Sequence, residues 1–214
     1  DVQSTPKEVE SQQKTIVNDN SINLQNVLSE MLSQKGPIHV NIPLEEPLYD
    51  FQVQKDLVAE QVKQPKKTQP KNLKSVQLKW KVSKRILVVV GTLSPDTLNA
   101  NSISVLAYDP RVVVLHEITS NLHHNNFIAH IDRVIIPIDK QEKSKEIFQS
   151  LAPDLIITMG GMVVSKKIKS LLRSYKGVPH HHVGTDRPLD TYYLGVQHLK
   201  VDPNYFFCEL TSSS

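Results

Sequence analysis

The sequence contains few glycines and a single cysteine. Seven glycines in 214 residues are too few for a chain that would cradle several phosphates, which disfavours a dinucleotide-binding function. Cys208 has no partner for an internal disulfide, and no secretory signal or long apolar run is found, so we expect a cytosolic protein with no membrane partner. The net charge of +3 is too small to indicate a nucleic-acid partner.

The first 50 residues show one helix pattern and one strand pattern. Residues 1–20 are polar without a sustained apolar period and are predicted to be loop. Apolar residues recur with helical spacing over residues 24–32, and residues 38–42 alternate as a short strand after Gly36-Pro37. Because a helix and a strand alone cannot cover both faces of a sheet, residues 1–50 are predicted to be the tail of another α/β domain.

Residues 51–81 are polar and basic and are predicted to be a linker. Lysines, glutamines and prolines dominate residues 63–71 without any apolar period. A nucleic-acid tether is the less favoured alternative, because aromatic side chains for base stacking do not alternate with these lysines.

From residue 82 onward, short apolar runs alternate with helical patterns. Strands are predicted at residues 86–90, 112–115, 133–136, 155–158, 180–183 and 199–201. Helices are predicted at residues 94–106, 140–151 and 165–175. Residues 82–214 are therefore predicted to form a three-layer, Rossmann-like α/β domain with a mostly parallel sheet.

A Gly160-Gly161 turn joins one predicted strand to a helix that begins with Ser165, Lys166 and Lys167. Backbone N–H groups, the helix dipole and the lysine charges together can hold an anion at such a helix start. The spacing matches neither the G-x-G-x-x-G fingerprint nor a P-loop. A tight turn followed by a capped helix explains the same residues without a ligand.

Arg187 and a run of histidines mark two further candidate sites. Arg187 lies at the carboxyl end of a predicted strand, where ligands bind in open α/β sheets, and its guanidinium suits a carboxylate; an ion pair with Asp186 or Asp190 is the alternative. Residues 180–182, all histidine, suggest a metal, but no Cys, Asp or Glu completes a ligand spacing. We predict no metal site.

Residues 36–44, GPIHVNIPL, followed by Glu46-Pro47-Leu48-Tyr49, resemble the end of the first domain of the MenD-type enzymes. These are the 2-succinyl-5-enolpyruvyl-6-hydroxy-3-cyclohexene-1-carboxylate synthases. The likeness continues in family order through residues 87–94, through Ser120-Asn121-Leu122 and through residues 153–166.

The resemblance implies a transferase of menaquinone biosynthesis with three α/β domains. It would use thiamine diphosphate and Mg²⁺ to decarboxylate 2-oxoglutarate and add the succinyl unit to isochorismate. Residues 1–50 would then end the pyrimidine-binding domain, and residues 82–214 would be the central, transhydrogenase-type domain. The activating glutamate and the GDG motif of the family belong to other parts of the enzyme.

The chain is therefore expected to hold no catalytic residue, cofactor or metal and to be inactive alone. Its implied partners are the flanking domains of the same enzyme, within a homo-oligomer, a dimer or tetramer. Because both substrates are polyanionic, the resemblance makes Ser165, Lys166, Lys167 and Arg187 candidate substrate-binding residues. An independent module that binds NAD, FAD or ADP is the alternative, and the shortage of glycine argues against it.

Overall fold

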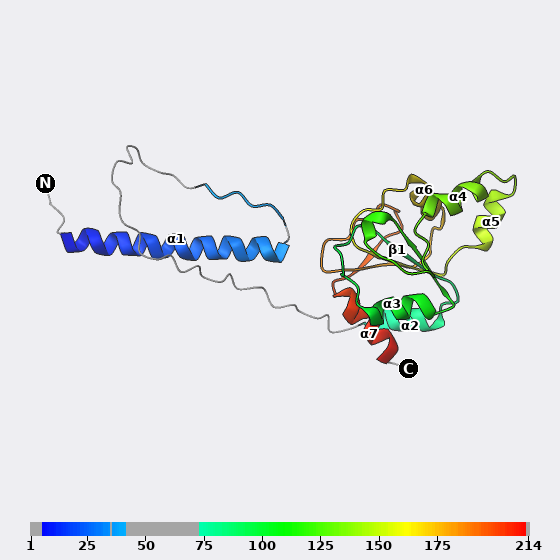
Figure 1. Ribbon diagram of the computed structural model, residues 1–214, viewed down its shortest axis with the longest axis horizontal. Coiled ribbons are helices and arrows are strands. Elements are labelled where there is room, and N and C mark those ends of the chain that lie inside the picture. Colours follow the sequence, from blue (N-terminus) through cyan, green and yellow to red (C-terminus); the bar gives the residue numbers. More distant parts are fainter. Residues whose placement is uncertain (1–5, 35, 42–72, 213–214) are drawn as a thin grey trace. The chain divides into compact units, whose positions relative to one another are not determined.

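The computed structural model describes residues 6–34, 36–41 and 73–212 (Figure 1). The chain divides into two units, Asp1–Lys67 and Thr68–Ser214. Within these ranges, none of the helices combines the length and the hydropathy of a membrane-spanning segment.

In the first unit, helix α1 spans Pro6–Gln34. The loop predicted for residues 1–20 is thus wrong from Pro6 onward, because proline is accepted in a first helical turn and the Glu, Gln and Lys residues after it are good helix formers. Residues 36–41 have no regular structure where the sequence predicted a strand, and Ile42 lies outside the described residues. A strand needs a neighbouring strand to satisfy its backbone groups.

The second unit contains a five-stranded, all-parallel sheet with strand order β2-β1-β3-β4-β5. The strands are β1 Ile86–Val90, β2 Val112–His116, β3 Leu155–Met159, β4 His180–Val183 and β5 Gln197–Leu199. The predicted three-layer, Rossmann-like α/β fold is confirmed. The continuous apolar runs form the central strands β1 and β3, whose two faces are both covered by helices.

Two helical layers cover the sheet, with α2, α3 and α7 on one side and α4, α5 and α6 toward the other (Figure 1). The helices are α2 Lys74–Val82, α3 Ala100–Tyr108, α4 Ile131–Asp139, α5 Ser144–Ser150, α6 Lys166–Ser174 and α7 Pro203–Ser212, and the 3-10 turn η1 is Ile118–Ser120. Alternate residues of a strand face opposite layers: Val88 packs in the cluster that contains Phe206, and Val89 in the cluster that contains Ile168.

Helix α2 occupies residues that the sequence assigned to the linker. Val76 and Trp80 are buried, and the Trp80 ring packs edge-on against Phe207 with 6.4 Å between ring centroids. The predicted linker is therefore wrong over residues 74–81, because α2 is stabilised by contacts with residues far away in the sequence. Residues 51–72 lie outside the described residues.

Three further elements differ from their predicted bounds. Residues 133–136 were predicted to be a strand but belong to α4, whose buried residues Ile131 and Ile135 are four apart, the spacing of a helix face. The helix predicted from residue 94 begins only at Ala100, where the Asn99 side chain caps it. The last strand ends at Leu199, two residues before its predicted end.

Candidate functional site

The Gly160-Gly161 turn lies at the carboxyl edge of the sheet, where the strand order reverses between β1 and β3. Ligands of open α/β sheets usually bind at such a point. Here the backbone occupies it, because the N–H of Gly161 donates to the carbonyl of Thr92 at 2.8 Å. A Cβ atom on Gly91 would lie 1.8 Å from the carbonyl oxygen of Gly161. The two loops therefore leave no room between them for a pyrophosphate, which argues against the nucleotide-binding alternative.

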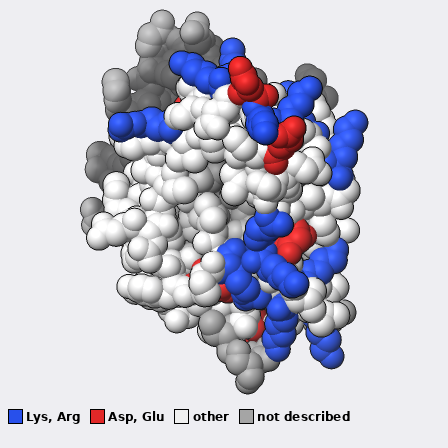
Figure 2. All heavy atoms as spheres, turned by 90° about the vertical axis from the view of Figure 1, so that its right-hand side faces the viewer, with Lys and Arg blue, Asp and Glu red and all other residues white. Residues whose placement is uncertain are grey.

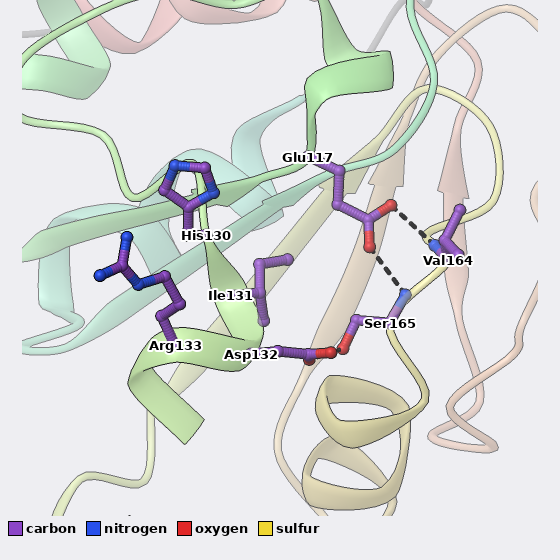
Figure 3. A pocket seen from close by; sticks show the side chains of 7 residues that line it. All are labelled: Glu117, His130, Ile131, Asp132, Arg133, Val164 and Ser165. Carbon is purple, nitrogen blue, oxygen red and sulfur yellow. Dashed lines mark hydrogen bonds between the residues drawn. The ribbon is translucent and has the colours of Figure 1, made fainter. Parts of the chain in front are cut away.

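The start of α6 already holds a carboxylate. Glu117 accepts hydrogen bonds from the backbone N–H groups of Val164 and Ser165, each at 2.7 Å (Figure 3). The Ser165 hydroxyl accepts from the N–H of Ile168 at 3.2 Å and donates to Asp132 at 2.5 Å. Ser165 caps the helix as predicted, but its polar groups are used by the chain itself. A substrate anion would have to displace Glu117 to reach them.

Glu117 is held in place by the 3-10 turn that follows β2. Its backbone N–H donates to the Ser120 hydroxyl at 3.2 Å, and that buried hydroxyl donates to the carbonyl of Val90 at 2.8 Å. Asn121, at a φ of 50°, ends the turn, and its side-chain amide donates to the carbonyl of Leu93 at 2.7 Å. The loops after β1, β2 and β3 are thereby joined into one hydrogen-bonded edge.

A pocket of about 260 Å³ opens beside this edge. It is lined by Glu117, His130, Ile131, Asp132, Arg133, Val164 and Ser165 (Figure 3). The Glu117 and Asp132 carboxylates point toward the start of α6, while His130 and Arg133 lie on the other side of the pocket (Figure 3). Two carboxylates at this mouth disfavour a polyanionic ligand.

Sequence reasoning missed both carboxylates. They reach Ser165 across 48 and 33 residues of chain, so no local spacing reveals the contacts. The one available signal was the place of Glu117, the first acidic residue after an apolar strand, at the edge where site residues of such sheets gather.

The structure gathers three of the four predicted substrate-binding residues at the start of α6. Lys167 pairs with Asp139 at 2.6 Å, and this hydrogen bond raises the pKa of Lys167. The Lys166 side chain is exposed and makes no hydrogen bond or ion pair within the described ranges. Arg187, the fourth predicted residue, is exposed in the loop after β4. It makes no described hydrogen bond or ion pair with the three residues at the start of α6.

Basic and acidic side chains lie close together on the face that Figure 2 shows. Figure 2 shows Lys and Arg side chains gathered in groups with Asp and Glu among them on one face. One ion pair of this unit joins Arg111 to Asp109, with 2.6 Å between the guanidinium nitrogen and the carboxylate oxygen.

The three consecutive histidines are buried within β4. The Thr158 hydroxyl lies 2.9 Å from Nε2 of His180 and 3.0 Å from Nδ1 of His182, as a bridge between the two rings. Burial lowers the pKa of each of the three histidines to about 4. Among the described residues, no group of three or more His, Cys, Asp or Glu side chains could hold a metal ion.

Comparison with known proteins adds a set of clear relatives, although no protein-family model matches the chain. The chain is 38% identical over 180 residues to the 2-succinyl-5-enolpyruvyl-6-hydroxy-3-cyclohexene-1-carboxylate synthase of Christiangramia forsetii. The aligned region covers 82% of this chain and 31% of that protein. It is 39% identical over 202 residues to the synthase of the same name from Flavobacterium johnsoniae, covering 90% of this chain and 34% of that protein. With the namesake from Desulfotalea psychrophila it shares 32% identity over 180 residues, covering 82% and 33% of the two chains. The chain thus spans about a third of the length of the curated relatives it matches.

Proposed function

This chain belongs to the 2-succinyl-5-enolpyruvyl-6-hydroxy-3-cyclohexene-1-carboxylate synthase family, and we propose that it is a segment of a longer protein that catalyses the reaction of that synthase. The observation that carries the proposal is identity of 38 and 39% over 82 and 90% of the chain with two relatives of that name. The protein would decarboxylate 2-oxoglutarate with thiamine diphosphate and Mg²⁺ and add the succinyl unit to isochorismate, as a cytosolic homo-oligomer of menaquinone biosynthesis.

The described residues of this chain do not fit the cofactor. Mg²⁺ with a diphosphate needs several oxygen ligands, and no cluster of three or more metal-ligating side chains is found within the described ranges. The contact between Gly91 and Gly161 closes the place at which such a sheet would hold phosphates. We therefore assign thiamine diphosphate and Mg²⁺ to the domains that flank this segment, and we expect the isolated chain to be inactive.

The proposed role of this segment is to support those domains and to offer cations to the substrates. Lys166 is the best candidate, because it is exposed at the start of α6 and makes no ion pair with another described residue. Lys167 is a weaker candidate, since Asp139 compensates its charge. Ser165 is assigned to holding the helix start rather than to touching substrate, because its N–H and hydroxyl are bonded to Glu117 and Asp132. Arg187 is a second exposed cation at the carboxyl edge.

The test compares the full-length protein with the 214-residue chain. Each is supplied with thiamine diphosphate, Mg²⁺, 2-oxoglutarate and isochorismate, and the loss of isochorismate is followed. We expect activity in the full-length protein and none in the chain alone. Absence of activity in a folded full-length protein, or micromolar binding of NAD, FAD or ADP by the chain in calorimetry, would contradict the proposal.

A further inference from the structure

The Glu117 carboxylate holds the backbone that leads into Lys166. It accepts one hydrogen bond from the N–H of Val164 and one from the N–H of Ser165, each at 2.7 Å (Figure 3). Ser165 is the N-cap of α6, and Lys166 is the first helical residue. The two peptide groups that Glu117 holds therefore lie immediately before Lys166, and they determine where its Cα atom lies.

Ser165 is fixed from a second side by Asp132, in the first turn of α4. The Ser165 hydroxyl donates to the Asp132 carboxylate at 2.5 Å and accepts from the N–H of Ile168 at 3.2 Å. Ser165 is only 7% exposed. Because its N–H and its hydroxyl are both bonded to other parts of the chain, the residue cannot shift without breaking one of these hydrogen bonds. The position of the start of α6 therefore depends on both carboxylates.

Glu117 is itself anchored to the end of β1. Its backbone N–H donates to the Ser120 hydroxyl at 3.2 Å, and this hydroxyl, on a fully buried residue, donates to the carbonyl of Val90 at 2.8 Å. Glu117 is thus bonded through its backbone to the sheet edge and through its carboxylate to the loop before α6. Because both ends of the residue are held, Glu117 fixes the start of α6 relative to β1.

We propose that Glu117 is a positioning residue for substrate binding, because its hold on residues 164–165 sets where the Lys166 ammonium can meet a substrate carboxylate. The inference rests on the proposed function, in which the exposed Lys166 offers its charge to a polyanionic substrate. A lysine side chain is long and flexible, so a backbone that is free to shift lets its ammonium occupy still more positions. A charge-assisted hydrogen bond weakens as its distance and angle depart from the preferred values.

Glu117 also decides which groups at the start of α6 are available to an anion. Its carboxylate occupies the N–H groups of Val164 and Ser165, and Asp139 compensates the charge of Lys167. A substrate carboxylate is therefore directed to the side chain of Lys166 rather than to the backbone. Loss of the negative charge of Glu117 would free the two N–H groups as a competing anion site. A clean test of positioning must consequently keep that charge.

Glu117→Asp in the full-length protein meets this condition. The aspartate keeps the charge but is one methylene group shorter, so it cannot reach both N–H groups from the same backbone position. We expect the KM for the substrate that responds to Lys166→Met to rise about three- to tenfold, as for a weakened charge-assisted hydrogen bond, with kcat changed less than about twofold. An unchanged KM in Glu117→Asp would overturn the proposal.

A double-mutant cycle shows whether Glu117 acts through Lys166. In the Lys166→Met background, Glu117→Asp should change KM by less than about twofold, because the interaction that it positions is already absent. An equal rise in KM in both backgrounds would overturn the proposal. An unchanged KM in Lys166→Met itself would refute the substrate role of Lys166, and the positioning role of Glu117 with it.

Asp154→Asn is the matched control. Asp154 also accepts hydrogen bonds from two backbone N–H groups, those of Lys84 at 2.8 Å and Arg85 at 3.1 Å, but at the start of β1 on the opposite edge of the sheet. The variant should lower the thermal stability and leave KM unchanged. A rise in KM equal to that of Glu117→Asp would assign the effect to general loosening of the domain and overturn the proposal. A folded wild-type protein without synthase activity would refute the proposed function, whereas an active one with the same KM in Glu117→Asp would refute the positioning role alone.

Discussion

Glu117 accepts a 2.7 Å hydrogen bond from the backbone N–H of Ser165, the residue that caps α6. Its carboxylate thus supplies, from within the chain, the negative charge that a bound phosphate or carboxylate supplies at other helix starts. The helix start that the sequence marked as an anion site is complete without a ligand. The same hydrogen bond joins the loop after β2 to the loop before α6, so it also stabilises the fold.

Replacement of Glu117 by alanine should therefore destabilise the chain. Two backbone N–H groups lose their acceptor, and each such loss costs about 1–3 kcal/mol where water cannot fully replace it. Glu117→Gln should cost less, since its amide keeps one acceptor oxygen. Urea unfolding monitored by circular dichroism provides the measurement.

Glu142→Ala is the matched control, because Glu142 is an exposed glutamate on the surface between α4 and α5. Its effect should stay within about 0.5 kcal/mol. Equal urea midpoints for Glu117→Ala and Glu142→Ala would show that the Glu117 bonds contribute nothing measurable.

The contact between the loops after β1 and β3 predicts unequal effects of two alanine substitutions. A Cβ on Gly91 would lie 1.8 Å from a backbone oxygen of Gly161, so Gly91→Ala must push the loops apart at a cost of more than about 3 kcal/mol. A Cβ on Gly161 would meet the Thr92 Cβ at 3.3 Å, and Gly161→Ala should cost only about 1 kcal/mol. Thermal unfolding of the two variants measures the two losses of stability. A smaller loss of stability in Gly91→Ala than in Gly161→Ala would contradict the close approach of the two loops.

Strands β1, β2 and β3 could be predicted from the sequence because each is a short, continuous apolar run. Ser165 was also predicted correctly as a helix cap, since capping depends on residues three positions apart. Long-range contacts escaped prediction: α2 was read as linker because its burial depends on Phe207 and its neighbours, more than 120 residues away. The hydrogen bonds of Glu117 to the start of α6 also escaped prediction, because its carboxylate comes from the turn after β2, 48 residues before Ser165.

The three buried histidines of β4 predict loss of stability in mild acid. Burial lowers the pKa of His180, His181 and His182 to about 4 in the folded chain, against about 6.5 when unfolded. Between these two values the unfolded chain binds more protons, so the free energy of unfolding falls as the pH falls from about 6.5 toward 4. Each histidine should account for about 2 kcal/mol between pH 8 and pH 5. Urea unfolding at both pH values measures the difference.

His181 offers the sharpest test of this pH dependence, because neither of its ring nitrogens has a hydrogen-bond partner among the described residues. His181→Leu removes a titrating group without breaking a bond, so the variant should lose less stability than wild type between pH 8 and pH 5. His123→Leu, at an exposed histidine, should show the wild-type pH dependence. The same pH dependence in His181→Leu and wild type would mean that His181 is not the titrating group.

Arg111 fastens α2 to the sheet. Its guanidinium donates to the carbonyls of Trp80 at 2.9 Å and Ser83 at 3.1 Å at the end of the helix, and to Asp109 at 2.6 Å. Arg111→Met should cost about 3 kcal/mol, because it leaves the carbonyls and the aspartate without their charged donor. In Arg111→Met, the backbone amides of residues 74–82 should exchange hydrogen faster than in wild type, whereas the exchange of β3 should change less. Lys145→Met, at an exposed lysine, is the control, and its α2 amides should exchange as in wild type. Wild-type exchange of α2 in Arg111→Met would refute the role of Arg111 in holding this helix.

The two adjacent lysines at the start of α6 should differ in their effect on substrate binding. Asp139 sits 2.6 Å from the Lys167 ammonium and compensates its charge, whereas Lys166 makes no ion pair with another described residue. In the full-length protein, Lys166→Met should raise the KM for 2-oxoglutarate or isochorismate about tenfold, the worth of one charge-assisted hydrogen bond, and Lys167→Met less than about threefold. Asp139→Asn supplies the control, because it removes the compensating charge and should not weaken substrate binding. A larger KM in Lys167→Met than in Lys166→Met would show that the Asp139 pair opens in the assembled enzyme and that Lys167 is the substrate-facing lysine.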